Sequence, residues 1–332
     1  MMNNLNILFL LLTFSSSLLS ISSTSWFSAW MGLELNMLSF VPLLIEQKNL
    51  FSNEAGLKYF LIQALASSLF LMFSILNTFF LFSFFIFMNF KFNPLSLPLL
   101  MKLGAPPFQT WFIMIMNKLT WYKGLLLSTW QKFAPLLILS YLELNINLIT
   151  FMALLSMMIG SVGGLNQMIL QKILAFSSIS HLGWLFSSML LNKNLLFIYF
   201  LIYSMISWLL FMFFSYNNIF HFNQNLSPIQ LLIFSISMLS LGGLPPLLGF
   251  LPKWLIIQNL IILKYSLLTT LLIFLTLLTL FFYIRLILNF SLILSQTTKW
   301  MSFNNFFYQN KFYFILSSLN FSMLMLFNVI FS

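Results

Sequence analysis

The chain has no cysteine and no aspartate, and its 332 residues include only four acids: Glu34, Glu46, Glu54 and Glu143. Without cysteine it cannot form a disulfide scaffold, a thiol active site or an iron–sulfur centre. Charged residues make up 5% of the sequence, whereas a soluble domain carries about 25%. So few charges cannot cover the surface of a compact soluble fold of this size. The absences therefore indicate a polytopic membrane protein.

The residues that are present support the same class. Apolar residues make up 61% of the chain, and the mean hydropathy is +1.01. Fourteen basic residues give a net charge of +10. The lysines are scattered singly and form no run or basic face, which argues against nucleic acid as a partner. In a membrane protein they serve as topology signals or as functional charges inside the bilayer.

Polar punctuation divides the sequence into segments long enough to span a bilayer, each needing about 20 apolar residues. It predicts an all-α protein with eleven transmembrane helices at about 5–22, 26–45, 57–85, 94–116, 123–143, 147–167, 170–191, 195–219, 228–262, 264–290 and 311–331. Segment 228–262 is too long for one straight span, and we interpret it as one span broken in its middle. Loops on the N-terminal side would hold seven lysines: Lys48, Lys58, Lys118, Lys123, Lys172, Lys299 and Lys311. The other side would hold three, so the positive-inside bias puts the N-terminus on the cytoplasm-equivalent face.

Two of these spans contain central Gly/Pro interruptions, KLGAPPF (102–108) and LGGLPPLLGFLPK (241–253). The residues that mark the breaks are Gly104, Pro106, Pro107, Gly242, Gly243, Pro245 and Pro246. Discontinuous helices in corresponding positions of two halves point to a transporter ion site. The interrupted spans are five apart, and this odd offset predicts an inverted repeat of two five-helix units within one transmembrane domain. The units would cover about 1–145 and 147–290, with an additional helix at about 311–331.

A second feature gives nearly the same repeat offset. Glu34 precedes Lys102 by 68 residues, and His181 precedes Lys253 by 72 residues. The alternative explanation is that Gly and Pro are simply more frequent in membrane helices than in soluble ones.

Four charged residues fall at or near the middle of predicted spans: Glu34, Lys102, Lys132 and Lys253. Each charge at a helix centre costs about 2.5–3.5 kcal/mol on insertion scales, so such residues are commonly functional. The alternative is a structural ion pair, or a lysine that snorkels to the interface. Burial disfavours the charged form of both residue types, which would let them exchange protons. The sequence therefore predicts proton transfer, with a Glu34–Lys102 pair as its switch and water held at the helix breaks.

The other polar residues are less informative. His181 titrates near neutrality and is either a proton relay or a hydrogen-bonded packing residue. The sequence predicts one solvated loop that contains Glu46, Lys48, Glu54 and Lys58. It also predicts that the Arg285 side chain snorkels from a helix end. The sequence contains no P-loop and no H-E-x-x-H. With no stretch long enough for a soluble domain, we expect no nucleotide or flavin site on this chain. We also predict no metal site.

Six segments occur in order and carry a family resemblance: WMGLELNMLSF, KLGAPPFQTW, TWQKFAPL, IGSVGGLNQ, KILAFSSISHLGW and LSLGGLPPLLGFLPKW. Over about residues 25–285 the sequence resembles the chain 2 family of mitochondrial NADH–ubiquinone oxidoreductase, respiratory complex I. The resemblance implies an antiporter-like subunit of the membrane arm. It also implies that the proton path of the family falls on Glu34, Lys102, Lys132 and Lys253. One departure is Gln109, where many relatives have a titrating His.

The resemblance implies no redox cofactor on this chain, with FMN, iron–sulfur clusters and ubiquinone on other subunits. The implied partners are other membrane-arm and supernumerary subunits and phospholipids such as cardiolipin, and not nucleic acid. The implied location is the mitochondrial inner membrane, with the N-terminus in the matrix and the C-terminus in the intermembrane space. Two alternatives stay open: a free-standing cation/proton antiporter of the same fold, and a scaffold subunit that pumps nothing.

Overall fold

The computed structural model describes residues 4–46, 49–78, 93–142, 144–221, 224, 226–245 and 247–297. Within these ranges every regular element is a helix, and the only strand-like feature is an isolated bridge between Ile169 and His221. Six helices are long and apolar enough to cross a membrane: Asn4–Ser22, Trp26–Leu44, Leu50–Asn77, Ile146–Leu165, Lys193–Asn217 and Ser266–Ile293. The all-α membrane class is therefore confirmed. The predicted helix at 311–331, the end of the predicted helix 57–85, Glu143 and Pro246 lie outside the described residues.

The chain divides into two compact units, residues 1–152 (unit 1) and 153–332 (unit 2). The helices of unit 1 are α1 (Asn4–Ser22), α2 (Trp26–Leu44), α3 (Leu50–Thr78), α5 (Ser96–Leu103), α6 (Thr110–Met116), α7 (Trp121–Ser128) and α8 (Trp130–Tyr141). Helix α9 (Ile146–Leu165) crosses the division, and unit 2 continues with α10 (Leu170–Met189), α11 (Lys193–Asn217), α12 (Pro228–Gly242), α13 (Phe250–Ile262) and α14 (Ser266–Thr297).

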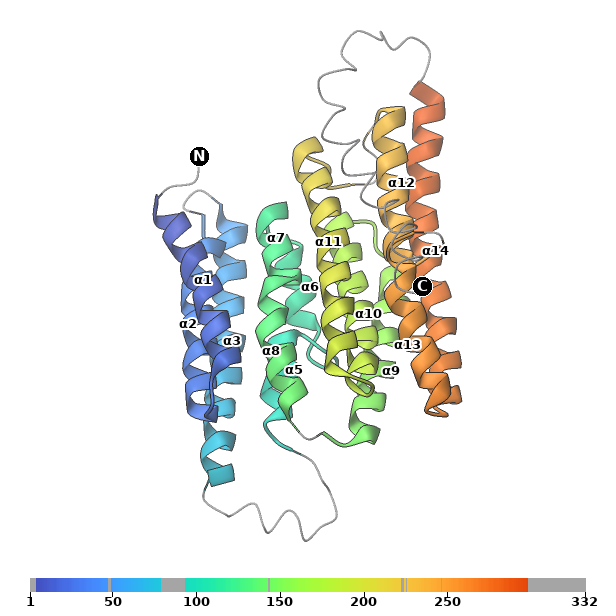
Figure 1. The fold of residues 1–332 in the computed structure, drawn as a ribbon. Helices are drawn as coiled ribbons and strands as arrows, with labels where there is room; N and C mark the ends of the chain where they lie inside the picture. Colours follow the sequence, from blue (N-terminus) through green and yellow to red (C-terminus); the bar gives the residue numbers. More distant parts are fainter. Residues whose placement is uncertain are drawn as a thin grey trace. The chain divides into compact units, whose positions relative to one another are not determined.

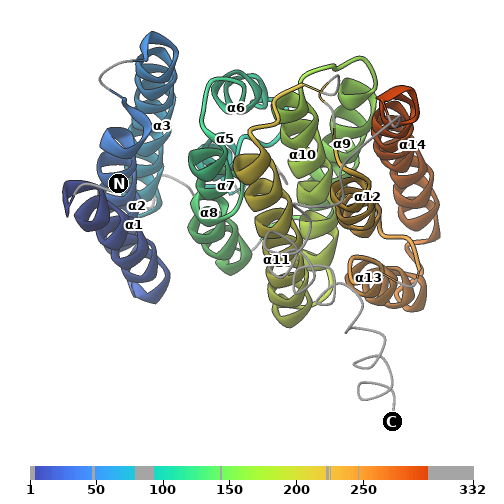
Figure 2. The same ribbon diagram turned by 90° about the horizontal axis from the view of Figure 1, so that it is seen from above.

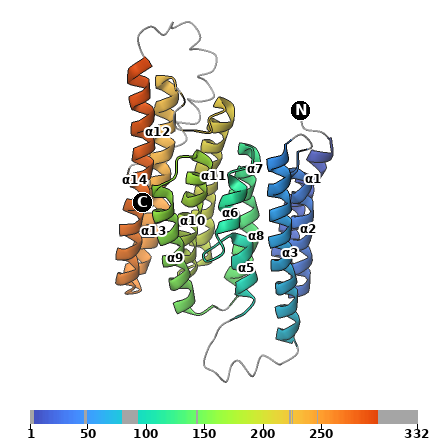
Figure 3. The same ribbon diagram turned by 180° about the vertical axis from the view of Figure 1, so that it is seen from behind.

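In unit 1, α1, α2 and α3 lie side by side (Figures 1 and 3), and α3 packs in turn against α5 and α6. The buried face of α1 consists of small hydroxyl residues: Thr13, Ser16, Ser17 and Ser20. Each of these hydroxyls donates to the carbonyl oxygen three residues earlier. The hydroxyls are thus satisfied within α1, and small side chains let α1 and α2 approach closely, as is common in membrane interfaces.

In unit 2, every residue of α10 from Leu170 to Ser188 is buried except Lys172. It contacts α11, α13 and α14, and Figure 2 shows it between α9 and α11. Close packing with α9 requires Gly160, because an added Cβ there would lie 2.5 Å from the backbone nitrogen of Ser180. The serines of α10 bond to carbonyl oxygens of their own helix. The most polar long helix of unit 2 therefore lies in its interior.

Three boundaries differ from the sequence prediction. The predicted helix 123–143 is two helices, because α7 ends at Ser128 and α8 begins at Trp130. Thr129 between them has φ −112° and ψ −75°, and its hydroxyl bonds to the Leu125 carbonyl at 2.7 Å. Pro135 lies within α8, six residues beyond Thr129, and has no N–H for the carbonyl of Gln131.

The other two corrections concern charged residues. Helix α3 begins at Leu50 instead of 57, so Glu54 and Lys58 lie on a helix and not in a loop. They form an ion pair of 2.7 Å at the i,i+4 spacing that brings side chains together. Helix α14 continues to Thr297 instead of ending at 290, so Arg285 lies within a helix and does not snorkel from its end.

Candidate functional site

Helix α5 ends just after Lys102 in a left-handed turn. Gly104 has φ 65°, a conformation that side chains with a Cβ rarely adopt. The N–H of Gly104 donates to Met101 and the N–H of Ala105 donates to Leu100, both at 3.1 Å. This is the Schellman arrangement, which satisfies two of the carbonyl groups left over at a helix C-terminus. The sequence KLGAPPF therefore ends a helix inside a predicted span.

Helix α12 ends in the same way. Gly243 has φ 78°, its N–H donates to Ser240 at 3.1 Å, and the N–H of Leu244 donates to Leu239 at 3.3 Å. Gly242, predicted as part of this break, is the last helical residue. Pro245 lies in the connection to α13, just as Pro106 and Pro107 lie in the connection to α6. Two glycines, Gly104 and Gly243, thus form equivalent turns in the two units.

Lys102 lies in the last turn of α5 and is 6% exposed. Its backbone carbonyl accepts a 3.3 Å hydrogen bond from Gln63 Nε2 of α3. Glu34 of α2 is close enough for its carboxylate to interact electrostatically with the Lys102 amine. Among the described residues, however, the two do not form an ion pair within 4.0 Å. Glu34 Oε2 is buried and accepts no hydrogen bond from the described part of the chain.

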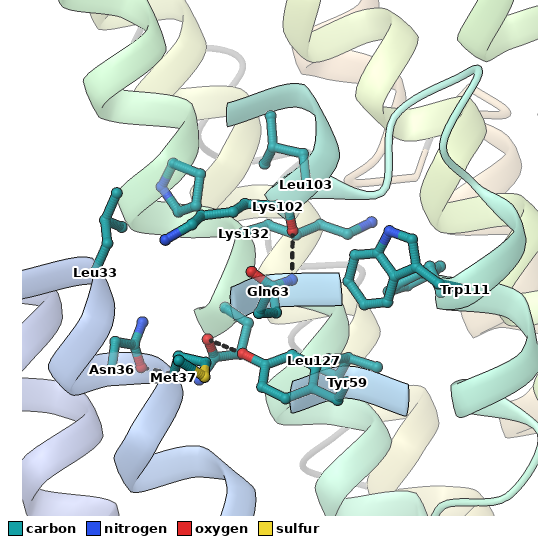
Figure 4. A pocket seen from close by; sticks show the side chains of 13 residues that line it. Leu33, Asn36, Met37, Tyr59, Gln63, Lys102, Leu103, Trp111, Leu127 and Lys132 are labelled. Carbon is teal, nitrogen blue, oxygen red and sulfur yellow. Dashed lines mark hydrogen bonds between the residues drawn. The ribbon is translucent and has the colours of Figure 1, made fainter. Parts of the chain in front are cut away.

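Lys132 lies in the first turn of α8 and is 2% exposed. Its Nζ lies 4.3 Å from the centroid of the Phe112 ring of α6. A cation over an aromatic face is stabilised by the ring quadrupole. Figure 4 shows the Lys102 side chain running toward Leu33 and the Lys132 side chain running the opposite way, toward Trp111. The two amines therefore point away from each other.

A cavity of about 20 Å³ lies between these elements, and both Lys102 and Lys132 line it. The other polar groups in its wall belong to Asn36, Tyr59, Gln63, Trp111 and Gln131. Such a volume has room for about one water molecule, and the polar wall offers it partners. Unit 1 therefore brings together two of the predicted site lysines, with Glu34 near Lys102 but outside the cavity wall.

Lys253 of unit 2 lies in the first turn of α13 and is 7% exposed. Its Nζ donates to the carbonyl oxygens of Leu241 at 3.0 Å and Gly242 at 2.8 Å. These carbonyls belong to the last turn of α12, where the helix dipole is negative and intrahelical donors are missing. Lys253 thus places a cation at the open end of a half-helix.

His181 of α10 is 6% exposed, and its Nδ1 lies 2.8 Å from the Tyr199 hydroxyl. Its ring also lies against Tyr203, with centroids 4.8 Å apart. His181 borders a cavity of about 10 Å³ together with Ser240 and Leu241, beside the turn that holds Lys253. This position fits either of the two predicted roles, a relay or a packing residue.

Sequence reasoning missed the neutral residues of both sites. Asn36, Tyr59, Gln63, Phe112, Gln131 and Tyr199 contact the charged residues or share hydrogen bonds with their neighbours. A signal was available for three of them, because Asn36, Gln63 and Gln131 are amides inside apolar predicted spans. Such groups are costly there unless they are hydrogen-bonded.

Comparisons with known proteins support a family assignment. A family model described as NADH:quinone oxidoreductase/Mrp antiporter, transmembrane, matches residues 23–279. The chain belongs to this family. NADH-ubiquinone oxidoreductase chain 2 of Anopheles gambiae is 47% identical over 309 residues, covering 91% of this chain and 90% of that protein. The protein of the same name from Aedes aegypti is 45% identical, with the same coverage.

Among solved structures, a chain of respiratory complex I from Thermus thermophilus with bound aureothin has the same fold, with a TM-score of 0.75. It is 24% identical and is matched over 87% of this chain and 71% of that chain. The span matched by the NADH:quinone oxidoreductase/Mrp antiporter family begins before α2 and ends within α14. It therefore includes both left-handed turns and all four charged residues: Glu34, Lys102, Lys132 and Lys253.

Proposed function

We propose that the chain is a proton-translocating membrane subunit of NADH:ubiquinone oxidoreductase, respiratory complex I. One observation carries the proposal: Lys102 and Lys132, both buried, line a single water-sized cavity beside a helix end. Buried lysines inside membrane helices are costly and commonly mark proton relays. The 47% identity to a protein named NADH-ubiquinone oxidoreductase chain 2 supports the assignment to this complex.

In the proposed step, a proton moves from one lysine to the other through the cavity. Glu34 attracts the charged Lys102 amine from α2. When this attraction weakens, one N–H bond of the Lys102 ammonium breaks and its proton forms a new O–H bond on water in the cavity. Another O–H bond of that water breaks, and its proton forms a new N–H bond on Lys132, which starts as a neutral amine. No other bond changes. Because the two amines point in opposite directions (Figure 4), the transfer needs the cavity as an intermediate.

Lys253 would act as a carrier of unit 2. Its amine donates to two backbone carbonyls at the end of α12, so its charged form is stabilised by the helix dipole. His181 beside the same turn is a candidate relay to it. Proton exchange at such helix ends requires no side-chain acid.

We propose the finer membrane arrangement on the same grounds. Eleven spans would form an inverted repeat of two five-helix units plus one additional helix, with the N-terminus in the matrix and the C-terminus in the intermembrane space. The repeat is supported by the two equivalent turns at Gly104 and Gly243, which close with the same pair of hydrogen bonds. The orientation is supported by the distribution of lysines between the predicted loops.

The remaining parts of the proposal concern partners. Redox chemistry with FMN, iron–sulfur clusters and ubiquinone would take place on other subunits. The lack of cysteine supports this for the iron–sulfur clusters, which need cysteine ligands. The chain would contact other membrane-arm and supernumerary subunits and phospholipids, including cardiolipin, in the mitochondrial inner membrane. Its action would thus be that of a translocase driven by remote redox chemistry.

The test is Lys102→Met in the intact complex, with Lys264→Met as a matched control on an exposed turn. Protons translocated per NADH oxidised are measured in reconstituted vesicles. We expect the ratio to fall in Lys102→Met and to stay unchanged in Lys264→Met. Normal assembly with an unchanged ratio in Lys102→Met would refute the pumping role and leave a scaffold subunit.

A second pair of variants tests the acid. Glu34→Gln removes the charge that interacts with Lys102, whereas Glu54→Gln removes a surface carboxylate paired with Lys58 and Lys118. We expect only Glu34→Gln to lower the proton ratio. The family description also names an antiporter. A free-standing cation/proton antiporter, the alternative function, would be purified without partner subunits and would exchange cations for protons by itself.

A further inference from the structure

Two residues of α3, Tyr59 and Gln63, bind both lysine-bearing segments of unit 1. They are one helical turn apart and are 2% and 5% exposed. The Tyr59 hydroxyl donates to Gln131 Oε1 at 3.2 Å, and Gln131 directly precedes Lys132. Gln63 Nε2 donates to the backbone carbonyl of Lys102 at 3.3 Å. Figure 4 shows both hydrogen bonds at the wall of the cavity.

The hydrogen bonds of Gln131 extend to the helix that carries Glu34. Gln131 Nε2 donates to Asn36 Oδ1 at 3.0 Å, so both ends of the Gln131 amide are used. Asn36 is 3% exposed and lies two residues after Glu34 on α2. The series Tyr59–Gln131–Asn36 therefore connects α3 with α8, which carries Lys132, and with α2, which carries Glu34.

The two lysine-bearing helices need such support because both are short and end near the lysines. Helix α5 has 8 residues and ends at Leu103, and α8 has 12 residues and begins at Trp130. The carbonyl of Lys102 is in the last turn of α5, where it has no intrahelical donor. Gln63 supplies that donor from a continuous 29-residue helix. A long helix thus fixes the ends of two short ones.

We propose that Tyr59, Gln63, Gln131 and Asn36 are positioning residues that hold Lys102 and Lys132 at the shared cavity. The proposal rests on the proton-translocating function argued above. The four residues act through the lysines and do not carry the proton. The amides of Gln63, Gln131 and Asn36 neither gain nor lose protons near neutral pH, and a tyrosine phenol, with an ordinary pKa of about 10, keeps its proton there. Their contribution is the alignment of the two amines, and small displacements of reacting groups are known to slow transfer strongly.

The first test removes a single oxygen atom from this set, with Tyr59→Phe in the intact complex. Tyr122→Phe, an exposed tyrosine at 54%, is the matched control. Loss of one hydrogen bond changes a population by a factor of roughly two to ten. We expect the proton ratio per NADH to fall within that range in Tyr59→Phe and to be unchanged in Tyr122→Phe. Assembly and thermal stability are measured beside it, since a merely structural role would move these and not the ratio.

The second test uses coupling between residues. Gln131→Met keeps the length of the side chain and removes both hydrogen bonds. The double variant Tyr59→Phe/Gln131→Met should be no worse than Gln131→Met alone, because the Tyr59 bond is already lost. Gln63→Met removes the hydrogen bond to the Lys102 carbonyl and should also lower the ratio. It provides the test if Tyr59→Phe fails to assemble.

Two outcomes would overturn the proposal: unchanged proton ratios in both Tyr59→Phe and Gln63→Met, or strictly additive effects in the double variant. Lys132→Met separates this failure from a failure of the function. If Lys132→Met lowers the ratio while the positioning variants do not, the function stands and the positioning role is wrong. If Lys132→Met also has no effect, the function itself is wrong.

Discussion

The Nζ of Lys253 donates a 2.8 Å hydrogen bond to the carbonyl oxygen of Gly242, the last residue of α12. The lysine comes from the helix after the break and closes the open end of the helix before it. Lys102, in contrast, lies before the glycine of its own break and interacts with Glu34. The two units therefore use equivalent turns with lysines on opposite sides of them, and their lysines differ in what holds the charge.

The first prediction concerns this bond. Lys253→Met leaves the buried carbonyls of Leu241 and Gly242 without their donor, which costs about 1–3 kcal/mol. We expect faster hydrogen exchange at the end of α12 and a loss of proton translocation. Lys264→Met, at an exposed position of the same unit, should change stability by less than about 0.5 kcal/mol. Unchanged exchange in Lys253→Met would show that the bond does not hold the turn.

The second prediction uses two adjacent glycines with different conformations. Gly243→Ala forces a Cβ into φ 78° and brings it within 2.8 Å of Lys253 Cδ. The left-handed conformation alone costs about 1–2 kcal/mol, and relief of the clash would displace the Lys253 amine from its carbonyls. We expect lower thermal stability and a lower proton ratio.

Gly242→Ala is the matched control for this substitution. Its Cβ would lie 3.5 Å from the nearest atom, in the Tyr283 ring, which is an ordinary contact. Because Gly242 is helical, alanine is favoured there by up to about 1 kcal/mol. Equal effects of the two substitutions would contradict the assignment of the turn to Gly243.

The sequence singles out the charged residues of the candidate site but not its neutral residues. Charge is rare in apolar spans, which singles out Glu34, Lys102, Lys132 and Lys253. The prolines that follow Gly104 indicate a helix break at that glycine. The partners of Tyr59 and Gln63 do not stand out, since Tyr59 and Gln131 are 72 residues apart in the chain. Hydrogen bonds between neutral side chains depend on which helix faces meet, and helical periodicity does not specify that pairing.

The break at Thr129 shows a similar limit. No glycine marks it, and Pro135 lies six residues later within α8. The interruption depends on the surroundings of Thr129, whose hydroxyl bonds to the Leu125 carbonyl of its own chain segment. The predicted helix 264–290 ends five residues after Arg285, whereas α14 continues through Thr297. In such apolar segments, tertiary packing overrides the helix propensities of the individual residues.

The third prediction concerns Phe112 and Lys132. Phe112→Leu removes the ring face that lies 4.3 Å from Lys132 Nζ, an interaction of about 0.5–2 kcal/mol. We expect a reduced rate of proton translocation with normal assembly. In a Lys132→Met background the same substitution should have little further effect, because the cation is absent. A full additional loss in that background would assign the effect to packing instead of to the cation.

The fourth prediction separates a structural charge from the charges proposed to carry protons. Arg285 of α14 donates from one guanidinium nitrogen to the carbonyl of Leu165, the last residue of α9, and from the other to Gln167 at 3.0 Å. Hydrogen bonds to charged groups contribute about 1.5–3 kcal/mol. Arg285→Met should therefore lower the thermal stability of the chain. Arg285→Lys should recover only part of the loss, because lysine lacks the planar fork.

The Arg285 variants should affect stability but not proton translocation. Arg285 closes a helix end and lines neither of the cavities that hold the candidate site residues. Complexes that carry Arg285→Met and remain assembled should keep the proton ratio of the native chain, unlike Lys102→Met. The ratio is measured in vesicles at a temperature well below the unfolding transition, so that stability and pumping are read separately. A lower ratio in fully assembled Arg285→Met would add this guanidinium to the proton path.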